Sequence, residues 1–364
     1  MARPPSRPEA ARRVCAAMQH HYYLAATDPV YRDNRRALEA NTRVARLAPR
    51  TSVIRIPVVV HVLYHGDNEN LEVSQIESQI DALNRDYRLQ NQDQNLIPAP
   101  FSPFATDTLV EFALAVRDPR GNPTTGITRT RTSKTVFPYD PSDQQATKKL
   151  NEMVKFDGFG KSAWPRDSYL NLWTCNLGGN LLGYATFPGE PAAIDGVVIK
   201  NTAFGSTGIA APPYNLGRTA VHEVGHWLNL LHIWGDDNGG CRGSDMVDDT
   251  PNQAGSNDSS VRISSFPHIT CNNGPNGDMF MNYMDYVDDD TMVMFTAGQL
   301  RRMNATLPGP RALLASSMGL TPVPTARLEP EAVAAQAMEG RRYVSDERGD
   351  RLTMEFDGVS WVPV

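Results

Sequence analysis

Three histidines and a glutamate lie within one apolar stretch, HEVGHWLNLLH, at residues 222–232. His222 and His226 are four residues apart, so on a helix both side chains project from one face and can bind the same metal ion. Glu223 lies beside them, where a general base would be needed. The spacing therefore indicates a catalytic zinc site. The alternative is a buried helix whose histidines are satisfied by ordinary hydrogen bonds.

A catalytic zinc site needs a third protein ligand and an open fourth position. In one class of HExxH enzymes a glutamate on a later helix is that ligand, but this sequence has no Glu from residue 224 to 328. The remaining candidate is His232. On a continuous helix it would lie about 80° from the direction of His222 and ~15 Å further along the axis. We therefore expect the helix to end and the chain to reverse between residues 227 and 231.

Asn229 stands where this reversal must occur. A tight reversal after a helix usually needs a residue with positive φ, most often glycine, and asparagine is the next most tolerant of that conformation. A helix that continued through residue 229 would contradict the zinc interpretation.

The composition is that of an ordinary soluble globular protein. Of 364 residues, 40% are hydrophobic and 21% are charged, and the net charge of −6 gives no reason to expect a nucleic-acid partner. The longest apolar runs, such as IPVVVHVLY, are shorter than the roughly 18 residues of a membrane span. The first 25 residues contain no apolar core typical of a signal peptide, so none is visible.

Strands and helices alternate in the first half of the chain. VIRIPVVVHVLYH, VEFALAV, YLNLWTCNL, LLGYATFP and DGVVIK are typical of strands, whereas VSQIESQIDALNRDYRLQN has helical periodicity. RTAVHEVGHWLNLL is predicted to begin as a helix, and residues 235 to 290 are dominated by loop-forming residues. The fold class predicted from this order is mixed α/β (α+β) with an irregular second half.

Several motifs together resemble one protease family. HExxHxxGxxH is the metzincin signature, which residues 222–232 resemble with Asn229 in place of glycine. A methionine turn follows in metzincins, and FMNYMDYVDDD contains such a methionine, Met284. With DMVDDTPNQAG, NYMDY and MFTAGQLRRM, the sequence looks like the pappalysin branch from about residue 50 to 305. The resemblance implies a metzincin catalytic domain: a mixed twisted sheet, a zinc-binding helix and a loop-rich C-terminal subdomain.

The resemblance also implies the roles of individual residues in the zinc site. It assigns three histidines to zinc: His222, His226 and His232. Glu223 would be the general base, and Tyr286 would approach the zinc and steady the tetrahedral intermediate. Met284 would pack beneath the metal as a structural residue. A packed core residue is the alternative for Tyr286.

Two further features of the family concern the substrate. LLGYATFP, with Gly183 and Tyr184, resembles the strand at the edge of the cleft, to which a peptide would add in antiparallel orientation. Asp289 matches an acidic residue of the pocket that accepts the side chain after the scissile bond. A preference for cleavage before Arg or Lys follows, unless Asp289 is a solvated acid in a DDD run.

Calcium binding and one disulfide are implied in the same way. Asp245 and Thr250 match family calcium ligands, and hard oxygen ligands suit calcium. An ordinary loop rich in Asp and Asn is the alternative. Cys241 and Cys271 match a family disulfide, and two free thiols are the alternative.

The N-terminal region resembles a latency segment. Cys15, in ARRVCAAM, is similar to the family's Arg-x-Cys-Gly motif, whose thiolate fills the open zinc position. A free helical cysteine is the alternative. We expect a pro-segment at residues 1–50 with cleavage near Arg50, a catalytic domain at 51–308 and a C-terminal extension at 309–364 that forms a β-hairpin.

The sequence thus predicts a secreted zinc endopeptidase that is made as a latent zymogen and acts on proteins or peptides. The alternative is a zinc-binding or structural module of the same fold that has lost catalysis. Retention of Glu223 and of three histidines favours the enzyme, because a closed structural site more often has four protein ligands.

Overall fold

The computed structural model describes residues 12–44, 51–237, 239–307, 309–323, 341–345, 351–356 and 361–363. The chain divides into two compact units, Met1–Pro322 and Val323–Val364, and each is described by itself. The first unit contains HEVGHWLNLLH. Arg50, where activation cleavage is expected, lies outside the described residues.

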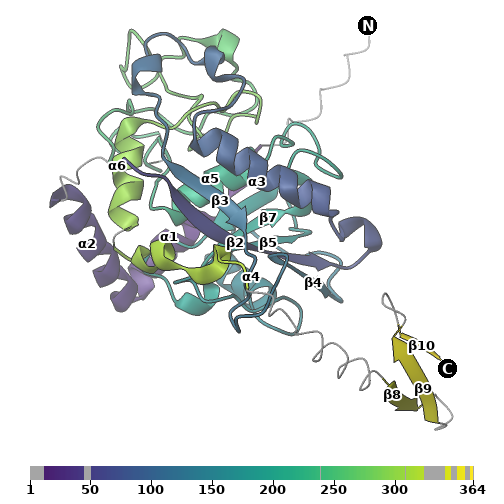
Figure 1. The fold of residues 1–364 in the computed structure, drawn as a ribbon. Coiled ribbons are helices and arrows are strands. Elements are labelled where there is room, and N and C mark those ends of the chain that lie inside the picture. Colours follow the sequence, from purple (N-terminus) through teal and green to yellow (C-terminus); the bar gives the residue numbers. More distant parts are fainter. Residues whose placement is uncertain are drawn as a thin grey trace, which may run out of the picture. The chain divides into compact units, whose positions relative to one another are not determined.

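A mixed seven-stranded sheet runs through the described part of the first unit (Figure 1). Its strands are β1 Val14–Cys15, β2 Ile54–Tyr64, β3 Val110–Leu114, β4 Ile127–Arg131, β5 Leu170–Cys175, β6 Leu181–Ala185 and β7 Val197–Lys200. The strand order is β1-β6-β7-β5-β2-β3, and β4 pairs with β2. Neighbouring strands are parallel except for the antiparallel pair β6–β7. The predicted α/β class is therefore confirmed.

Strand β2 is central because its side chains are apolar on both faces. Residues 56–63 are all buried, as expected for a strand that is covered by other elements on each side. It pairs with β5 at Val58↔Leu170 and with β4 at Val60↔Ile127. Strands β5 and β7 connect it to β6, which lies next to the edge strand β1.

Six α-helices occur in the described part of this unit: α1 Ala17–Thr27, α2 Pro29–Val44, α3 Val73–Tyr87, α4 Ala146–Val154, α5 Arg218–Trp227 and α6 Ala297–Thr306. Helix α3 buries Ile76, Ile80, Leu83 and Tyr87, which lie on one face at helical spacing. This face packs against β3 and α5 (Figure 1). Helix α5 in turn contacts β6 and β7, so that it lies beside the sheet edge.

A second, smaller core contains residues from α4, β5 and β6. Leu150 and Val154 of α4 pack there with Trp173 and Tyr184. The tyrosine ring of Tyr184 is therefore buried in this core rather than displayed for a ligand. Helix α4 and strand β4 are elements that the sequence patterns do not predict.

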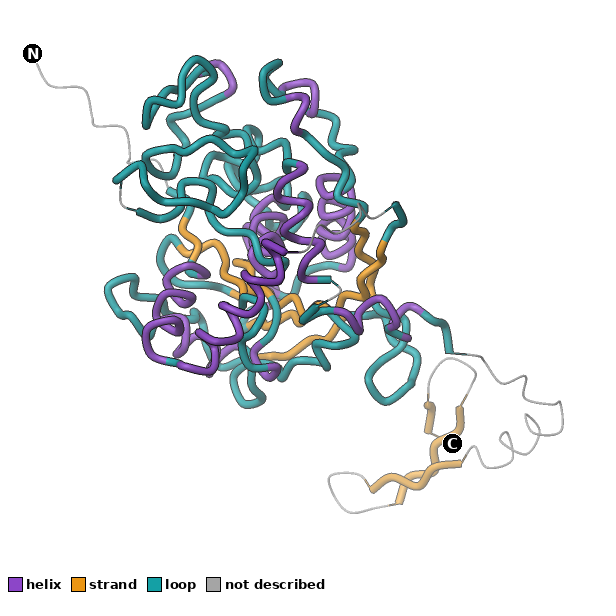
Figure 2. Tube along the Cα trace, turned by 90° about the vertical axis from the view of Figure 1, so that its left-hand side faces the viewer, coloured by secondary structure: helices purple, strands orange, loops and turns teal. Residues whose placement is uncertain are grey.

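Loops dominate the region between α5 and α6. The described residues from 228 to 296 contain one 3₁₀ turn and no α-helix. Figure 2 shows how much of the tube is made of loops and turns, drawn in teal. The 3₁₀ turns of the first unit are Asp67–Glu69, Gln94–Leu96, Ser102–Phe104, Ala192–Ile194, Asn201–Ala203, Ile263–Ser265, Ala312–Ser316 and Met318–Leu320. No helix in the described part of the chain combines the length and apolar character needed to cross a membrane.

The second unit is a three-stranded antiparallel sheet with the order β10-β9-β8. Its strands are β8 Arg341–Ser345, β9 Arg351–Phe356 and β10 Trp361–Pro363. The expected hairpin corresponds to β8 and β9, and β10 adds a third strand.

Candidate active site

The helix that carries the first two histidines ends where the third requires it to end. Helix α5 ends at Trp227, and Asn229 has φ 80°, in the left-handed region. The turn brings the Nε2 atom of His226 to 3.1 Å from that of His222 and 3.2 Å from that of His232. The chain therefore reverses between residues 227 and 231, as the sequence predicts.

The three imidazoles fit a zinc ion. In a tetrahedron with Zn–N bonds of about 2.0–2.1 Å, ligand nitrogens lie ~3.3 Å apart, close to the distances between these Nε2 atoms. His222 donates from Nδ1 to the carbonyl of Tyr283, at 2.7 Å, which leaves Nε2 free to bind metal. Burial lowers the pKa of His222 and His226, which keeps both rings neutral as metal ligation requires.

Met284 packs directly beneath this helix. The residue is fully buried, and a Cβ added at Gly225 would lie 2.5 Å from its sulfur. Gly225, inside the HExxH motif, is therefore needed to let the thioether approach the helix. The Met284 N–H donates to Asn282 Oδ1 at 2.9 Å, which holds the turn in place.

Glu223 is a buried acid that faces Cys15. Burial raises the pKa of Glu223 to about 8, while the Cys15 thiol and Arg13 oppose this shift. The Cys15 Sγ donates to Glu223 Oε2 at 3.3 Å. Sγ also lies within 4.8 Å of the ligand nitrogens of the three histidines. Cys15 and the three histidines form one candidate metal-binding cluster.

Tyr286 covers the same cluster. Its ring centroid lies 5.0 Å from that of His232 and 5.7 Å from that of His222. Its hydroxyl donates to the Cys15 carbonyl at 3.4 Å. The structure thus brings Tyr286 to the site rather than into a separate core.

The N-terminal segment occupies the edge of the sheet. Strand β1 pairs with β6 in parallel at Val14↔Leu181 and Cys15↔Gly183, and Ala16 donates its N–H to the Gly183 carbonyl at 3.2 Å. Among the described strands, β1 is the edge strand on this side of the sheet, and β6 is its neighbour. A Cβ on Gly183 would lie 2.9 Å from Glu223 Cγ, so that only glycine leaves room for the glutamate.

Asp289 is fully buried, not solvated, and lies in a pocket that holds an arginine. Arg13 Nη2 donates to Asp289 Oδ1 at 2.6 Å, and Arg13 Nη1 donates to the Thr219 hydroxyl at 3.0 Å. The guanidinium carbon lies 4.8 Å from the centroid of the Tyr214 ring. Main-chain N–H groups of Leu216 and residue 218 donate to the other carboxylate oxygen. Arg13 is the arginine of the Arg-x-Cys pattern that precedes the candidate latency cysteine, but nothing in the sequence pattern pointed to its contact with Asp289, or to Thr219 and Tyr214.

Asp245 and Thr250 lie together in the loop after the histidine turn. The Thr250 hydroxyl is 2.9 Å from Asp245 Oδ2, and the Val247 N–H donates to Asp245 Oδ1 at 3.1 Å. Burial raises the pKa of Asp245 to about 7. Its hydrogen-bond donors are neutral, and among the described residues no cation lies within salt-bridge distance of this buried acid.

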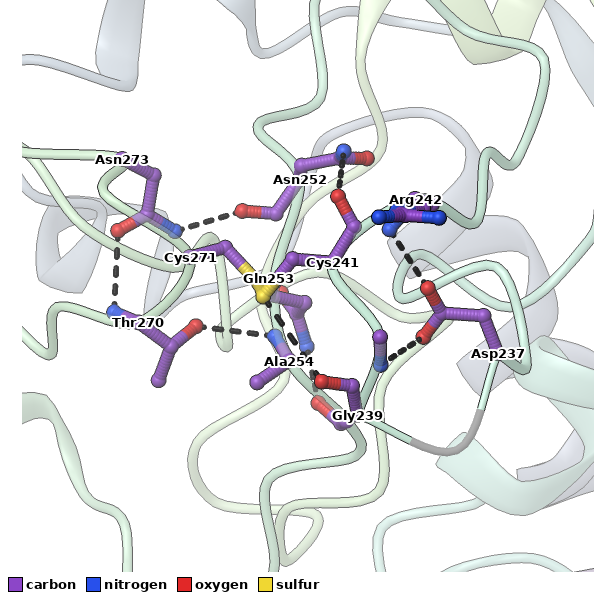
Figure 3. The surroundings of a disulfide bond; sticks show 12 residues. Asp237, Gly239, Cys241, Arg242, Asn252, Gln253, Ala254, Thr270, Cys271 and Asn273 are labelled. Carbon is purple, nitrogen blue, oxygen red and sulfur yellow. Dashed lines mark hydrogen bonds between the residues drawn. A yellow bond between two sulfur atoms is a disulfide. The ribbon is translucent and has the colours of Figure 1, made fainter.

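A disulfide joins Cys241 and Cys271, 30 residues apart (Figure 3). Thr270 and Asn273, next to Cys271, bond to the segment that follows Cys241: the Thr270 hydroxyl accepts from the Ala254 N–H, and Asn273 donates to the Asn252 carbonyl. The bridge and these bonds tie together loops that contain little regular structure.

Residues 155–308 match the peptidase family described as pregnancy-associated plasma protein-A. An extracellular metalloprotease of Pyricularia oryzae is 39% identical over 153 residues, which are 40% of this chain and about half, 51%, of that protein. An extracellular metalloprotease of Arthroderma benhamiae is 30% identical over 275 residues, which are 73% of this chain and 82% of that protein.

A solved structure extends this similarity to a larger share of the chain. A mutant of Tannerella forsythia promirolysin is 42% identical, with a TM-score of 0.74, over 83% of this chain and 97% of that one. The family match at residues 155–308 includes the histidine turn, Met284 and the loops between them. The chain belongs to the pappalysin family of zinc metalloendopeptidases.

Proposed function

We propose that this chain is a latent, secreted zinc endopeptidase whose metal is held by His222, His226 and His232. The observation that carries the proposal is the convergence of the three Nε2 atoms with the Cys15 sulfur, all within 4.8 Å of one another. The relatives that are named extracellular metalloproteases support secretion.

Glu223 and Tyr286 would carry out the chemistry once the N-terminal segment has left. Zinc, when bound, would supply a Lewis acid that polarises the scissile carbonyl and acidifies a water molecule. The Glu223 carboxylate would take a proton from that water and give it to the leaving amine. The Tyr286 hydroxyl, released from the Cys15 carbonyl, would donate to the oxyanion.

Latency would depend on Cys15 and on the direction of β1. In the presence of zinc the Cys15 thiolate would occupy the open position beside the three histidines. Strand β1 runs parallel to β6, whereas a substrate is expected to run antiparallel. The reversed direction would let the described residues around Cys15 fill the cleft without being cut there, as part of a segment comprising residues 1–50. These residues are the proposed pro-segment, followed by a catalytic domain at 51–308 and an extension at 309–364.

Cleavage before Arg or Lys is supported by the occupant of the Asp289 pocket. Arg13 supplies a guanidinium whose charge is matched by the buried carboxylate and whose second nitrogen reaches Thr219. A substrate arginine would replace Arg13 when the segment leaves. The backbone of Gly183 and Tyr184 would bind the peptide, since the Tyr184 ring is buried.

A calcium ion would bind at Asp245 and Thr250. The supporting observation is a buried carboxylate that is surrounded by neutral donors and adjacent oxygen atoms. A divalent cation would compensate the charge that burial disfavours.

Casein cleavage by the activated protein tests the proposed function. We expect hydrolysis that is abolished by a zinc chelator, restored by zinc, and absent from the Glu223→Ala protein with its zinc retained. A folded, zinc-loaded protein that cleaves no protein substrate after removal of residues 1–50 would favour the inactive module instead.

A further inference from the structure

The three imidazoles of the cluster are oriented by different kinds of partner. His222 and His226 donate from Nδ1 to main-chain carbonyls, those of Tyr283 and Leu230. His232 instead has its Nδ1 2.9 Å from the carboxylate Oδ1 of Asp236. One of the three ligands is therefore held by a charged side chain that lies four residues further along.

The chain adopts an unusual conformation to bring this carboxylate to the ring. Gly235 has φ 69° and Asp236 has φ 53°, two consecutive residues in the left-handed region. A Cβ at Gly235 would collide with the backbone of Gly243 and Ser244. Aspartate tolerates this region better than most residues, but the conformation still costs free energy. The turn keeps the Asp236 side chain 17% exposed, beside the 2% exposed ring of His232.

We propose that Asp236 is a positioning residue for zinc, an inference that rests on the zinc site proposed above. An ionised carboxylate can only accept, so His232 carries its proton on Nδ1 and presents the lone pair of Nε2 to the metal. The negative charge also raises the basicity of the imidazole, so that Nε2 donates its electron pair to a metal ion more strongly. Trp234, stacked on the His232 ring at 4.2 Å, leaves the ring little freedom to turn away.

Asp237, the acid adjacent to Asp236, has different contacts. The Asp237 carboxylate accepts from main-chain N–H groups of Gly240, Arg242 and Gly243, and among the described residues it forms no hydrogen bond with a histidine. Asp237 therefore supports the loop, while Asp236 supports the ligand. Two neighbouring carboxylates of equal charge provide a matched pair of variants.

Zinc affinity of the full chain tests the inference, measured by competition with a chromophoric chelator. All variants carry Glu223→Ala to prevent self-cleavage. Asp236→Asn keeps the tolerance for positive φ and a carbonyl acceptor, but it loses the charge. Asp236→Gly relieves the backbone conformation and removes the side chain altogether. We expect both to bind zinc about 10- to 100-fold more weakly, and Asp237→Asn to bind within about twofold of the parent.

Thermal unfolding of the zinc-free proteins separates positioning from stability. Asp236→Asn should unfold at the temperature of the zinc-free parent, and the increase on adding zinc should be smaller. Zinc affinity of Asp236→Asn and Asp236→Gly within about twofold of the parent would overturn the inference. A parent protein that binds no stoichiometric zinc would instead refute the proposed metal site itself.

Discussion

At the scale of single residues, Asp289 is the acid whose role depends most on its surroundings. A carboxylate in a DDD run would ordinarily be solvated, but here it is buried with Arg13 and two main-chain donors. Burial makes its charge available only to a cation inside the pocket. This distinguishes Asp289 from Asp290, whose side chain is 67% exposed.

Replacing Asp289 by Asn should reduce cleavage before arginine selectively. Loss of a buried charge pair costs roughly 2 kcal/mol or more, so kcat/KM for a peptide with Arg after the scissile bond should fall by about 30-fold or more. A matched peptide with Leu at that position should be affected much less. Asp290→Asn is the control. Equal losses on both peptides would mean that Asp289 supports the fold rather than selecting the substrate.

Residue types and spacing predict most of the zinc site, because HExxH requires both histidines on one helical face. They do not reveal Thr219 or Asp236, and they give Arg13 only as part of the Arg-x-Cys pattern, because Arg13 meets Asp289 and Thr219 only through tertiary contacts. The position of Asp236, four residues after His232, was visible in the sequence, but its partner depends on a turn with two positive φ angles. Gly225 likewise looks like filler within the motif until Met284 is seen beneath it.

At the scale of elements, the turn after α5 depends on Asn229. This residue has φ 80°, and both polar atoms of its buried amide lack a hydrogen-bond partner among the described residues. Asn229→Gly should therefore leave the free energy of unfolding unchanged or raise it. Asn229→Ala should lower it by about 1–2 kcal/mol, because Cβ disfavours the left-handed region. Urea unfolding measures both, and equal stability of the two variants would contradict this account.

Helix α2 gives the N-terminal segment a second point of attachment to the rest of the unit, independent of Cys15. The Arg302 guanidinium on α6 donates through Nη1 to Glu39 Oε2 at 2.8 Å and through Nε to the Asn229 carbonyl at 2.7 Å. Arg302 is buried, so its charge is compensated by Glu39 of the N-terminal segment. The segment is thus attached to the same turn that positions His232.

Glu39→Gln should speed self-activation of the full-length protein. The neutral amide cannot compensate the positive charge of the buried guanidinium. The lifetime of the latent form should therefore fall at least about tenfold, and gel analysis of processing over time measures this lifetime. Cys15→Ala should act separately, and the double variant should activate faster than either. Asp33→Asn, on the exposed side of α2, is the control. Unchanged latency of Glu39→Gln would contradict a second attachment point.

The central strands were predictable because apolar runs such as that of β2 need burial on both faces. Strand β1 was not, since its two residues become a strand only by pairing with β6. Strand β4, Ile127–Arg131, has only one apolar residue, followed by alternating threonine and arginine. This pattern carries too little apolar signal to predict a strand. Helix α4 is nine residues long, too short for its apolar spacing to indicate a helix clearly.

At the scale of the whole molecule, stability should depend on calcium because the loop region has little regular structure. Millimolar calcium should raise the unfolding temperature, by an amount equivalent to about 2.7 kcal/mol when calcium exceeds Kd by 100-fold, and EGTA should reverse the effect. Asp245→Asn should abolish the response, whereas Asp248→Asn, an exposed neighbour, should retain it. An unfolding temperature that is indifferent to calcium would argue against the site.

The first unit continues beyond residue 308, where the sequence composition changes. Arg311 is buried, forms a bidentate ion pair with Asp195 and lies 3.6 Å over the Trp227 ring at the end of α5. Such a contact depends on the tertiary fold and leaves no periodic signal in the sequence. The compact unit accordingly ends at Pro322.

Mass-spectrometric mapping of the bonds cut in a denatured proteome tests the central claim most directly. The activated protein should cut before Arg and, less often, Lys, and these cuts should disappear with a zinc chelator and in Glu223→Ala. Cleavage that survives in a pure Glu223→Ala protein, or bonds cut without regard to the residue that follows, would contradict the account.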